Sequence, residues 1–317
     1  MPLIPLGRGP EFDRIRAIAK ALGPRASDLG NDCALVRLGS VTLALTTDVS
    51  VERVHFRREW LSLEEIGWRA AAASLSDLAA AGAQPIGLLA ALTMAPGEPE
   101  PAFASVMSGV GAAVESVGGT VLGGDLSRGG DMSLAITAIG SVDRPIGRSG
   151  ARPGDGLWVT GELGGARAAL AAWRAGREPD PRARARFAHP EPRIEAGRWL
   201  AAHGARAMLD VSDGLAGDAA HLAAASGVRV RVELEKIPAH PAVATEARAT
   251  GEPAAAFAAQ GGEDYELLVA MPAEPADRSG IPPLPLTRIG RIEAGPAEVV
   301  FALDGRRLHF SGYDHFA

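Results

Sequence analysis

The segment at residues 62–82, SLEEIGWRAAAASLSDLAAAG, is the feature that most restricts how this chain folds. It predicts a long helix that is apolar nearly all round and begins with a capping box formed by Ser62 and Glu65. One carboxylate, Asp77, stands inside the alanine run, and its neighbours at helical spacing include no cation. A buried carboxylate is costly unless a positive charge meets it. The fold must therefore bring cations or protons to Asp77.

Further aspartates stand at the ends of apolar runs. A single strand-end aspartate is usually a turn or cap residue, but six that are each joined to buried structure favour convergence in one site. Two carboxylates about 5 Å apart repel by roughly 3 kcal/mol at an effective dielectric constant of about 20. An all-oxygen donor set without His or Cys favours Mg²⁺ over zinc. The six are Asp32, Asp48, Asp77, Asp125, Asp210 and Asp213.

Other polar groups near these aspartates suit a phosphate-handling site. Thr46 and Thr47 add oxygens beside Asp48, and the backbone N–H groups of the adjacent Gly123–Gly124 pair can contact a phosphate. Arg148, between glycines in GRSG, can pair bidentately with a phosphate or can be a solvated loop arginine. His55 follows the acidic TTD run, and a lone histidine is more often structural.

Composition excludes several classes of protein. The chain has 317 residues and a formal net charge of −6, which argues against a nucleic-acid binder that relies on a basic surface. The single cysteine, Cys33, excludes an internal disulfide framework and a cysteine-rich zinc site, and fits a reducing compartment. No GxxxxGK[ST], GxGxxG after a strand, HExxH or GxSxG motif occurs. All but two of the 32 basic residues are arginine.

The sequence gives no sign of export or membrane insertion. Residues 1–20 contain no apolar core of a signal peptide, and the longest apolar runs are about half the length of a bilayer span. We therefore expect a cytoplasmic protein that does not bind membranes.

Hydrophobic patterning predicts an α+β fold of two domains, with helices on one face of each sheet. A Gly/Pro/Arg cluster at 147–156 places the boundary, so that the domains are 1–146 and 147–317. Residues 177–193 are interpreted as a polar, proline-rich connector. Helices are expected at 11–22, 62–82, 101–118, 164–176, 194–204 and 215–227, and strands at 41–48, 86–94, 120–125, 133–142, 157–161, 228–238 and within 206–214 and 261–272.

Seven motifs in fixed order carry a resemblance to a known family. They are GNDCALV, TTDVSVERVHF, LSDLAAAGAQP, GGDLSRG, GRSGARPGD, DVSDGLAGD and GGEDYEL. In this order they closely resemble the thiamine-monophosphate kinases, which belong to the superfamily of aminoimidazole-ribonucleotide synthetase and selenophosphate synthetase. The resemblance extends from about residue 11 to GYDHF at 312–316. Each motif alone is weakly specific, and together they are strongly specific.

This resemblance implies ATP-dependent phosphorylation of thiamine monophosphate to thiamine diphosphate with several Mg²⁺ ions. It implies an N-terminal domain with a mixed or antiparallel sheet that binds ATP and Mg²⁺ and pairs in a homodimer, and a C-terminal α+β domain that completes the active site. The residues it implies are Asp32, Thr46, Thr47, Asp48, Asp77, Asp125, Asp210 and Asp213 for metal, Gly124, Asp125, Arg148 and Ser212 for ATP, and His55, Glu263, Asp264 and Tyr313 for the thiamine substrate.

Two positions depart from the family pattern. Asn31 replaces a carboxylate in the usual GDD, so the metal role rests on Asp32. Arg53 stands where glycine is common, and it brings a charge near His55.

The residues favour direct transfer of the γ-phosphoryl group without a general base. A phosphate monoester has a second pKa of about 6, so the acceptor is largely ionised at neutral pH. Metal ions and arginine relieve the repulsion between the two anions, and positioning supplies most of the rest. Two alternatives stay open: another superfamily enzyme that forms an acyl- or imido-phosphate, and a catalytically silent nucleotide or metal binder.

Overall fold

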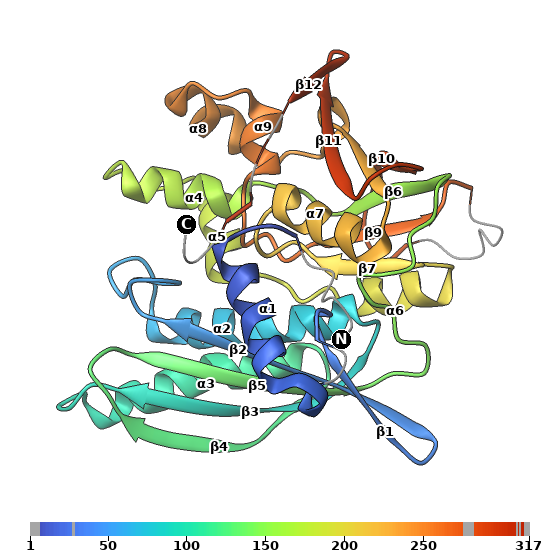
Figure 1. Cartoon of the computed structure of the whole chain (residues 1–317). Helices are drawn as coiled ribbons and strands as arrows, with labels where there is room; N and C mark the ends of the chain where they lie inside the picture. The colour runs from blue at the N-terminus through green and yellow to red at the C-terminus, as the bar shows by residue number, and fades with distance from the viewer. Residues whose placement is uncertain (1–6, 27–28, 275–281, 309, 311, 314–317) are drawn as a thin grey trace.

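The computed structural model describes residues 7–26, 29–274, 282–308, 310 and 312–313, and it contains two β-sheets (Figure 1). The sheet of the N-terminal half has the strand order β1-β2-β5-β3-β4. Its strands are β1 (Ala34–Leu38), β2 (Val41–Val51), β3 (Gln84–Met94), β4 (Thr120–Arg128) and β5 (Ser133–Ser141). All neighbouring pairs are antiparallel except β3 and β4, which are parallel.

Two helices, α2 (Leu63–Ala80) and α3 (Glu100–Ser116), cover one face of this sheet. The expected capping box is present, because the Ser62 side chain accepts from Glu65 N–H and Glu65 accepts from Ser62 N–H. The helices touch backbone to backbone: a Cβ on Gly67 would lie 1.9 Å from Val106 O, and one on Gly109 would lie 1.8 Å from Glu64 O. Glycine at both positions is therefore required for the close packing of α2 on α3.

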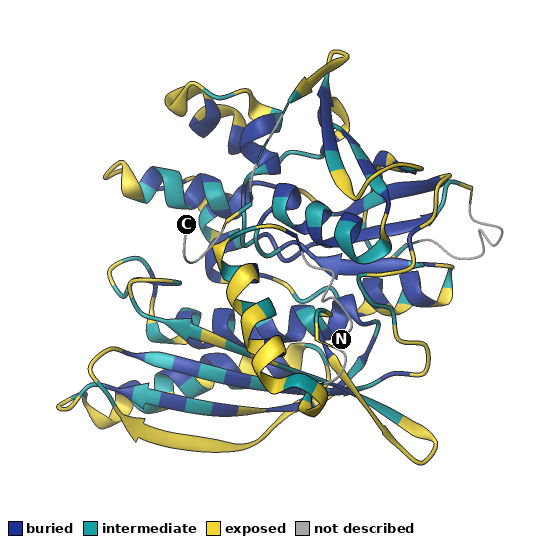
Figure 2. Cartoon of the chain, in the orientation of Figure 1, coloured by how far each residue is buried: buried dark blue, intermediate teal, exposed yellow. Residues whose placement is uncertain are grey.

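The opposite face of this sheet, here called the outer face, has many exposed residues in the part of the chain that the structure describes. Every residue of β4 is exposed, as the yellow strand in Figure 2 shows, while β5 alternates between buried and half-buried residues. Apolar side chains stand on this surface, with Ile86, Leu89 and Leu122 exposed by 45%, 39% and 51%. Such a contiguous apolar surface marks an interaction site in a folded protein.

The sheet of the C-terminal half is larger, with the order β12-β11-β8-β10-β6-β9-β7. Only β8 and β11 pair in parallel among its described strands. Its strands are β6 (Asp155–Thr160), β7 (Ala207–Asp210), β8 (Arg229–Glu233), β9 (Leu267–Pro272), β10 (Leu286–Glu293), β11 (Glu298–Leu303) and β12 (Arg306–Leu308). The remaining helices are α1 (Pro10–Leu22), α4 (Gly165–Arg174), α5 (Pro181–Ala188), α6 (Ile194–Ala202), α7 (Leu215–Ser226), α8 (Val243–Thr250) and α9 (Ala254–Ala259), with 3₁₀ turns at Gly23–Arg25 and Leu234–Lys236.

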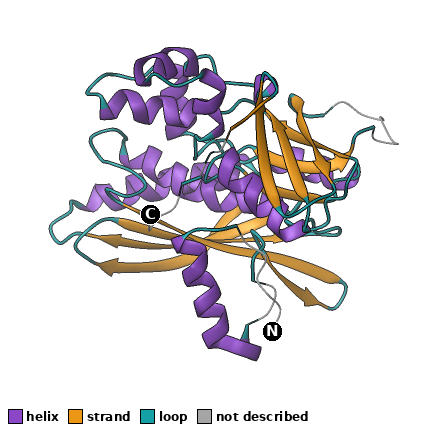
Figure 3. Cartoon of the chain, turned by 45° about the horizontal axis from the view of Figure 1, so that its top comes forward, coloured by secondary structure: helices purple, strands orange, loops and turns teal. Residues whose placement is uncertain are grey.

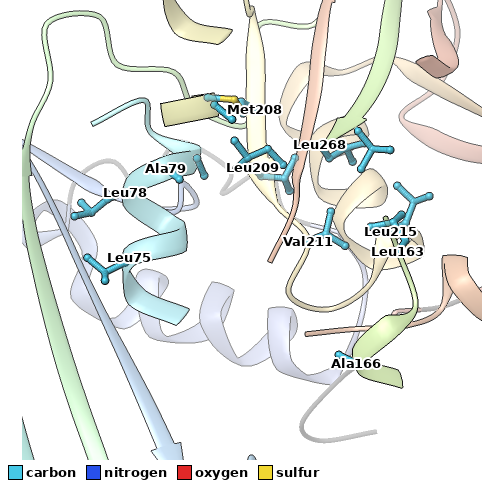
Figure 4. Packing of buried hydrophobic residues seen from close by; sticks show 14 of the residues in the cluster. Leu75, Leu78, Ala79, Leu163, Ala166, Met208, Leu209, Val211, Leu215 and Leu268 are labelled. Carbon is cyan, nitrogen blue, oxygen red and sulfur yellow. The ribbon is translucent and has the colours of Figure 1, made fainter. Parts of the chain in front are cut away.

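The two halves share one continuous apolar core. Helix α2 contacts β7, α5 and α6 of the C-terminal half, and helices lie between the two groups of strands in Figure 3. In Figure 4, Ala79 of α2 lies near Leu209 of β7, while Leu78 points to the other side of the helix. A Cβ on Gly197 of α6 would lie 2.0 Å from Ala79 O, so α6 also approaches α2 closely. The core therefore fixes α2 against both sheets.

The α+β architecture is confirmed, and most expected elements are present within a few residues. The interpretation of residues 177–193 as a connector is wrong, because α5 lies within this segment. Asp180 caps α5 by accepting from Arg182 and Ala183 N–H, and Pro181 occupies the first turn. The strand expected at 228–238 ends at Glu233 and continues as a 3₁₀ turn. The sequence patterns did not predict β1, α8, α9 and β10 to β12.

Candidate active site

Three of the expected aspartates meet where α2 contacts β7. Asp32 precedes β1, Asp77 lies in the last turn of α2, and Asp210 ends β7. One carboxylate oxygen from each lies within 4.8 Å of the other two. The side chains of Asp32 and Asp210 are almost fully buried. The fold therefore brings carboxylates from both halves of the chain together at the α2–β7 contact.

Hydroxyl groups and one guanidinium hold these carboxylates. Thr46 Oγ1 donates to Asp77 Oδ2, and Ser76 Oγ donates to Asp210 Oδ2 over 2.7 Å. Arg148 Nε donates to Asp32 Oδ1 over 2.9 Å. Asp48 lies two residues after Thr46, on the same face of β2, and its buried Oδ2 has no hydrogen-bond partner among the described residues. A bound cation would coordinate such an unsatisfied buried carboxylate oxygen.

The electrostatics of this group also fit a cation. Burial and the neighbouring carboxylates raise the pKa of Asp77 well above its usual value. Burial, with Asp32 next, raises the pKa of Asp210 to about 8 against the opposing effects of Ser76 and Arg148. Burial, with Asp32 as a further cause, also raises the pKa of Asp48. A hard divalent cation bound by these oxygens would remove both the repulsion and the bound protons.

Cys33 is not a candidate ligand for this cation. Its Sγ donates to the carbonyl oxygen of Asp77 over 3.3 Å. Burial and the surrounding carboxylates raise the pKa of the Cys33 thiol, so it stays protonated at neutral pH. The donor set is therefore oxygen only, which fits Mg²⁺.

A second group lies at the start of α7, where one ligand atom each from Asp213, Asp218 and His221 lie within 4.8 Å of one another. Asp218 is buried, and its Oδ2 has no hydrogen-bond partner among the described residues. Gly7 N–H donates to His221 Nδ1 over 3.1 Å. This hydrogen bond assigns the proton of the neutral ring to Nε2. Burial lowers the pKa of His221 to about 3, so the ring is neutral.

Arg148 stands near both groups. Its charge opposes the rise in the pKa of Asp210 and of Asp218. Its backbone N–H donates to Asn31 Oδ1 over 3.1 Å, so the residue that departs from the family pattern holds the Arg148 loop. A cavity of about 260 Å³ opens beside Asp32, with Leu35 and Ile146 in its lining. Arg148 is therefore held by two residues that line this cavity, Asn31 and Asp32.

Thr47 and Asp125 lie on the outer face, away from Asp77. Thr47 Oγ1 shares a hydrogen bond of 2.8 Å with Thr137 Oγ1. Asp125 on β4 is paired in register with Ala91, which is itself paired with Ala135 of β5. Strands β2 and β4 are three strand spacings apart, which is about 14 Å. Within one chain, Thr47 and Asp125 are therefore too far apart to bind the same ion.

Each acidic residue of GGEDYEL, residues 261–267, has its own partner. Glu263 forms an ion pair with Arg69 of α2. Asp264 accepts from Gly164 N–H over 2.7 Å at the start of α4. Glu266 is fully buried and accepts from Thr160, Arg186 and Arg193. Two of the three carboxylates therefore support the loop, and a direct contact of Asp264 with substrate stays a prediction.

The remaining candidates lie at turns near these groups. His55 is half-buried after β2, and its Nδ1 accepts from Val51 N–H over 3.1 Å. Arg53 forms an ion pair with Asp131. Its φ of 68° explains why glycine suits this position. Tyr313 is exposed, and its N–H donates to Asp213 O over 3.0 Å. Residues 314–316 of GYDHF lie outside the described residues.

Comparisons with known proteins agree with this arrangement. The description "AIR synthase related protein, N-terminal domain" matches residues 30–142, and the corresponding C-terminal domain matches residues 152–302. Curated thiamine-monophosphate kinases are similar over most of their length. The one from Aquifex aeolicus is 36% identical over 96% of this chain and 98% of its own, and the one from Halobacterium salinarum is 38% identical over 95% and 99%. The chain belongs to the thiamine-monophosphate kinase family.

A solved structure agrees with this membership of the thiamine-monophosphate kinase family. The structure "AaThiL complexed with AMPPCP and TMP" is 34% identical, with a TM-score of 0.87 over 100% of this chain and 99% of its own. Among the described residues, no helix has the length and apolar character needed to cross a membrane.

Several residues that shape this member of the thiamine-monophosphate kinase family were not found from the sequence. Ser76, Asp218 and His221 contact or adjoin the expected ligands, and Arg69 pairs with Glu263. A usable signal exists for Arg69, because it lies eight residues before Asp77 on the same side of α2 and is the only charge between Glu65 and Asp77. His221 carries no comparable signal, since its contact with Gly7 joins residues 214 positions apart in the chain.

Proposed function

We propose that this chain is an ATP-dependent kinase that phosphorylates thiamine monophosphate to thiamine diphosphate. The observation that carries the proposal is the convergence of Asp32, Asp77 and Asp210 from three separate elements. Its support comes from relatives named thiamine-monophosphate kinase and from the similar structure described as a complex with AMPPCP and TMP.

The site would hold Mg²⁺ through Asp32, Asp48, Asp77 and Asp210, with Thr46 as a further oxygen donor and Asp213 in the second group. Because the Thr47 hydroxyl lies on the outer face, Thr47 would contribute only its backbone carbonyl oxygen. When bound, Mg²⁺ neutralises the charge of the phosphate groups and keeps them in line. Arg148, held by Asp32 and Asn31, would bind a phosphate of ATP, together with Ser212 and, in the homodimer proposed below, the backbone of the partner's Gly124. The side-chain contacts described above keep these donors in place before the ligands arrive.

We propose direct in-line transfer without a general base. The acceptor phosphate has a second pKa of about 6 and needs no proton removed at neutral pH. Oxygens of Asp32, Asp77 and Asp210 lie within 4.8 Å of one another, an arrangement that suits binding of one hard cation. Glu263, His55 and Tyr313 would contact the thiamine part of the acceptor, since Glu263 and Tyr313 both adjoin the strand-end segment that carries Asp210 and Asp213.

We further propose a homodimer in which the outer faces of two N-terminal sheets pack together. The exposed apolar residues Ile86, Leu89 and Leu122 supply the contact surface. A second sheet on this face would bring its own β4 over β2, so that the partner's Gly124 and Asp125 could complete the ATP site. Light scattering should give twice the chain mass, and L122E should give a monomer with reduced ATP binding. A monomeric wild-type protein with full activity would contradict this arrangement.

Product analysis after mixing the protein with Mg–ATP and thiamine monophosphate tests the function. We expect thiamine diphosphate and ADP in equal amounts, and no turnover with aminoimidazole precursors. Alanine at Asp48 or Asp210 should abolish turnover with little loss of folding, and wild-type rates in either variant would refute the assignment. Calorimetry that shows Mg–ATP binding without any product would favour the catalytically silent binder. The cytoplasmic location stays a prediction from the sequence.

A further inference from the structure

A buried arginine of the N-terminal half makes direct contact with the proposed substrate-binding turn. The side chain of Arg69 on α2 is only 4% exposed, and the described residues give it one ion-pair partner, Glu263. Its Nη1 donates to the carbonyl oxygen of Phe187 over 2.7 Å, and its guanidinium carbon lies 3.9 Å from the centre of the Phe187 ring. A carbonyl, an aromatic face and a carboxylate therefore fix the guanidinium from three sides.

Glu263 itself has a left-handed backbone conformation that non-glycine residues rarely adopt. Its φ is 72°, and Tyr265 two residues later has a φ of 51°. The backbone is held there because Glu263 N–H donates to Ser212 O over 2.8 Å and Tyr265 N–H donates to Val211 O over 2.9 Å. A left-handed conformation at two non-glycine residues is costly and marks a position whose side-chain direction matters.

The Glu263 carboxylate is partly open to solvent, unlike its neighbours. Its side chain is 25% exposed, whereas Asp264 and Glu266 are buried against their own partners. Arg69 contacts Oε2, which leaves the other oxygen for a ligand. Because α2 rises 1.5 Å per residue, the Cα atoms of Arg69 and Asp77 are about 12 Å apart along the helix. The carboxylate is thus held at a set distance from the metal-binding group by the same helix.

We propose that Arg69 is a positioning residue that aims Glu263 at the part of the acceptor remote from the transferred phosphoryl group. This inference rests on the proposed function, in which Glu263 contacts thiamine monophosphate. Arg69 touches neither substrate. It fixes one oxygen of Glu263 and balances its charge, so that the second oxygen faces the acceptor in one orientation. Loss of Arg69 therefore weakens binding of the acceptor and leaves binding of ATP unchanged.

The test compares R69M, R69K and E263Q with R184M as a matched control. Arg184 on α5 forms a bidentate ion pair with Glu65 of α2, with N···O distances of 2.7 and 2.8 Å. R184M therefore also breaks an ion pair between the N-terminal and C-terminal halves of the chain. We expect R69M to raise KM for thiamine monophosphate about 10- to 100-fold, the range for loss of a hydrogen bond to a charged group. KM for ATP should stay within about twofold, R69K should recover part of the loss, and R184M should match wild type.

The double variant R69M/E263Q separates positioning from general support. If Arg69 acts through Glu263, the double variant should be no worse than the poorer single variant. Two results would overturn the proposal. One is an additive loss of affinity for thiamine monophosphate in the double variant. The other is a rise in KM for both thiamine monophosphate and ATP that is equal in R69M and R184M. Melting temperatures of the same set keep the test independent of activity. If wild type shows no turnover of thiamine monophosphate, the proposed function fails, while non-additive melting shifts for R69M and E263Q would still show that the two residues act together.

Discussion

Replacing Asp210 with asparagine should make the metal-free protein more stable while removing its response to Mg²⁺. Asp210 is buried within 4.8 Å of the Asp32 and Asp77 carboxylates, and burial with the Asp32 charge raises its pKa to about 8. In the unfolded chain the pKa returns to an ordinary value near 3.8. Between these two values the folded state holds a proton that the unfolded state has lost, so the stability of the folded state falls as pH rises.

The size of the effect follows from that difference in pKa. At 1.36 kcal/mol for each pKa unit, the ionisation of Asp210 costs at most about 5 kcal/mol at pH 8. Asparagine keeps an oxygen that accepts from Ser76 Oγ and carries no charge. Allowing for relaxation of the site, we expect D210N to gain about 2–5 kcal/mol. For a chain of this length the gain corresponds to a rise in Tm of roughly 3–7 °C.

Thermal unfolding in EDTA at pH 8 and pH 5 measures this gain. The advantage of D210N should be largest at pH 8 and should shrink by more than half at pH 5, where wild-type Asp210 is protonated. Added Mg²⁺ should raise the Tm of wild type and leave that of D210N nearly unchanged. A D210N protein that is less stable than wild type in EDTA at pH 8, or equal stabilisation of both by Mg²⁺, would refute the reasoning.

Two further predictions concern the scaffold. In G67A a Cβ would meet Val106 O at 1.9 Å, so α2 and α3 must separate; we expect a loss of about 1–3 kcal/mol in chemical denaturation. The control G111A on α3 has open space at its Cβ and should not destabilise, so equal losses would contradict the packing argument. Burial raises the pKa of Asp264 to about 7, so its contribution makes wild-type stability fall as pH rises from about 4 to 7. D264N keeps an acceptor for Gly164 N–H and should reduce this fall, and an unchanged pH profile would show that Asp264 does not titrate there.

The sequence predicted the parts of the molecule that depend on local pattern. The capping box of α2, its apolar surroundings and the need for a neutralising partner at Asp77 all follow from residues close together in the chain. Hydrophobic patterning predicted the α+β fold, because alternating strands and apolar helices are mixed in each half of the chain. The meeting of Asp32, Asp77 and Asp210 was expected, since strand ends and buried helices bring such carboxylates to one place.

The sequence could not show which way side chains point when direction depends on distant elements. The arginines of α5 made residues 177–193 look like a solvated connector, yet Arg184 and Arg186 pair with Glu65 and Glu266 from other elements. Asp125 and Asp77 look equivalent as isolated acidic residues, but sheet register places Asp125 on the outer face. Register and long-range ion pairs are set by tertiary packing, which no short window of sequence contains.

Helix α2 carries both Asp77, which we propose as a metal ligand, and Arg69, which contacts Glu263. In the proposed function, this helix sets a fixed separation of eight residues between the metal-binding carboxylates and the residue that positions Glu263 at the remote part of the acceptor. Phosphate esters too short to reach both the metal-binding carboxylates and Glu263 should be phosphorylated slowly even at saturation, because only one of their ends would be held.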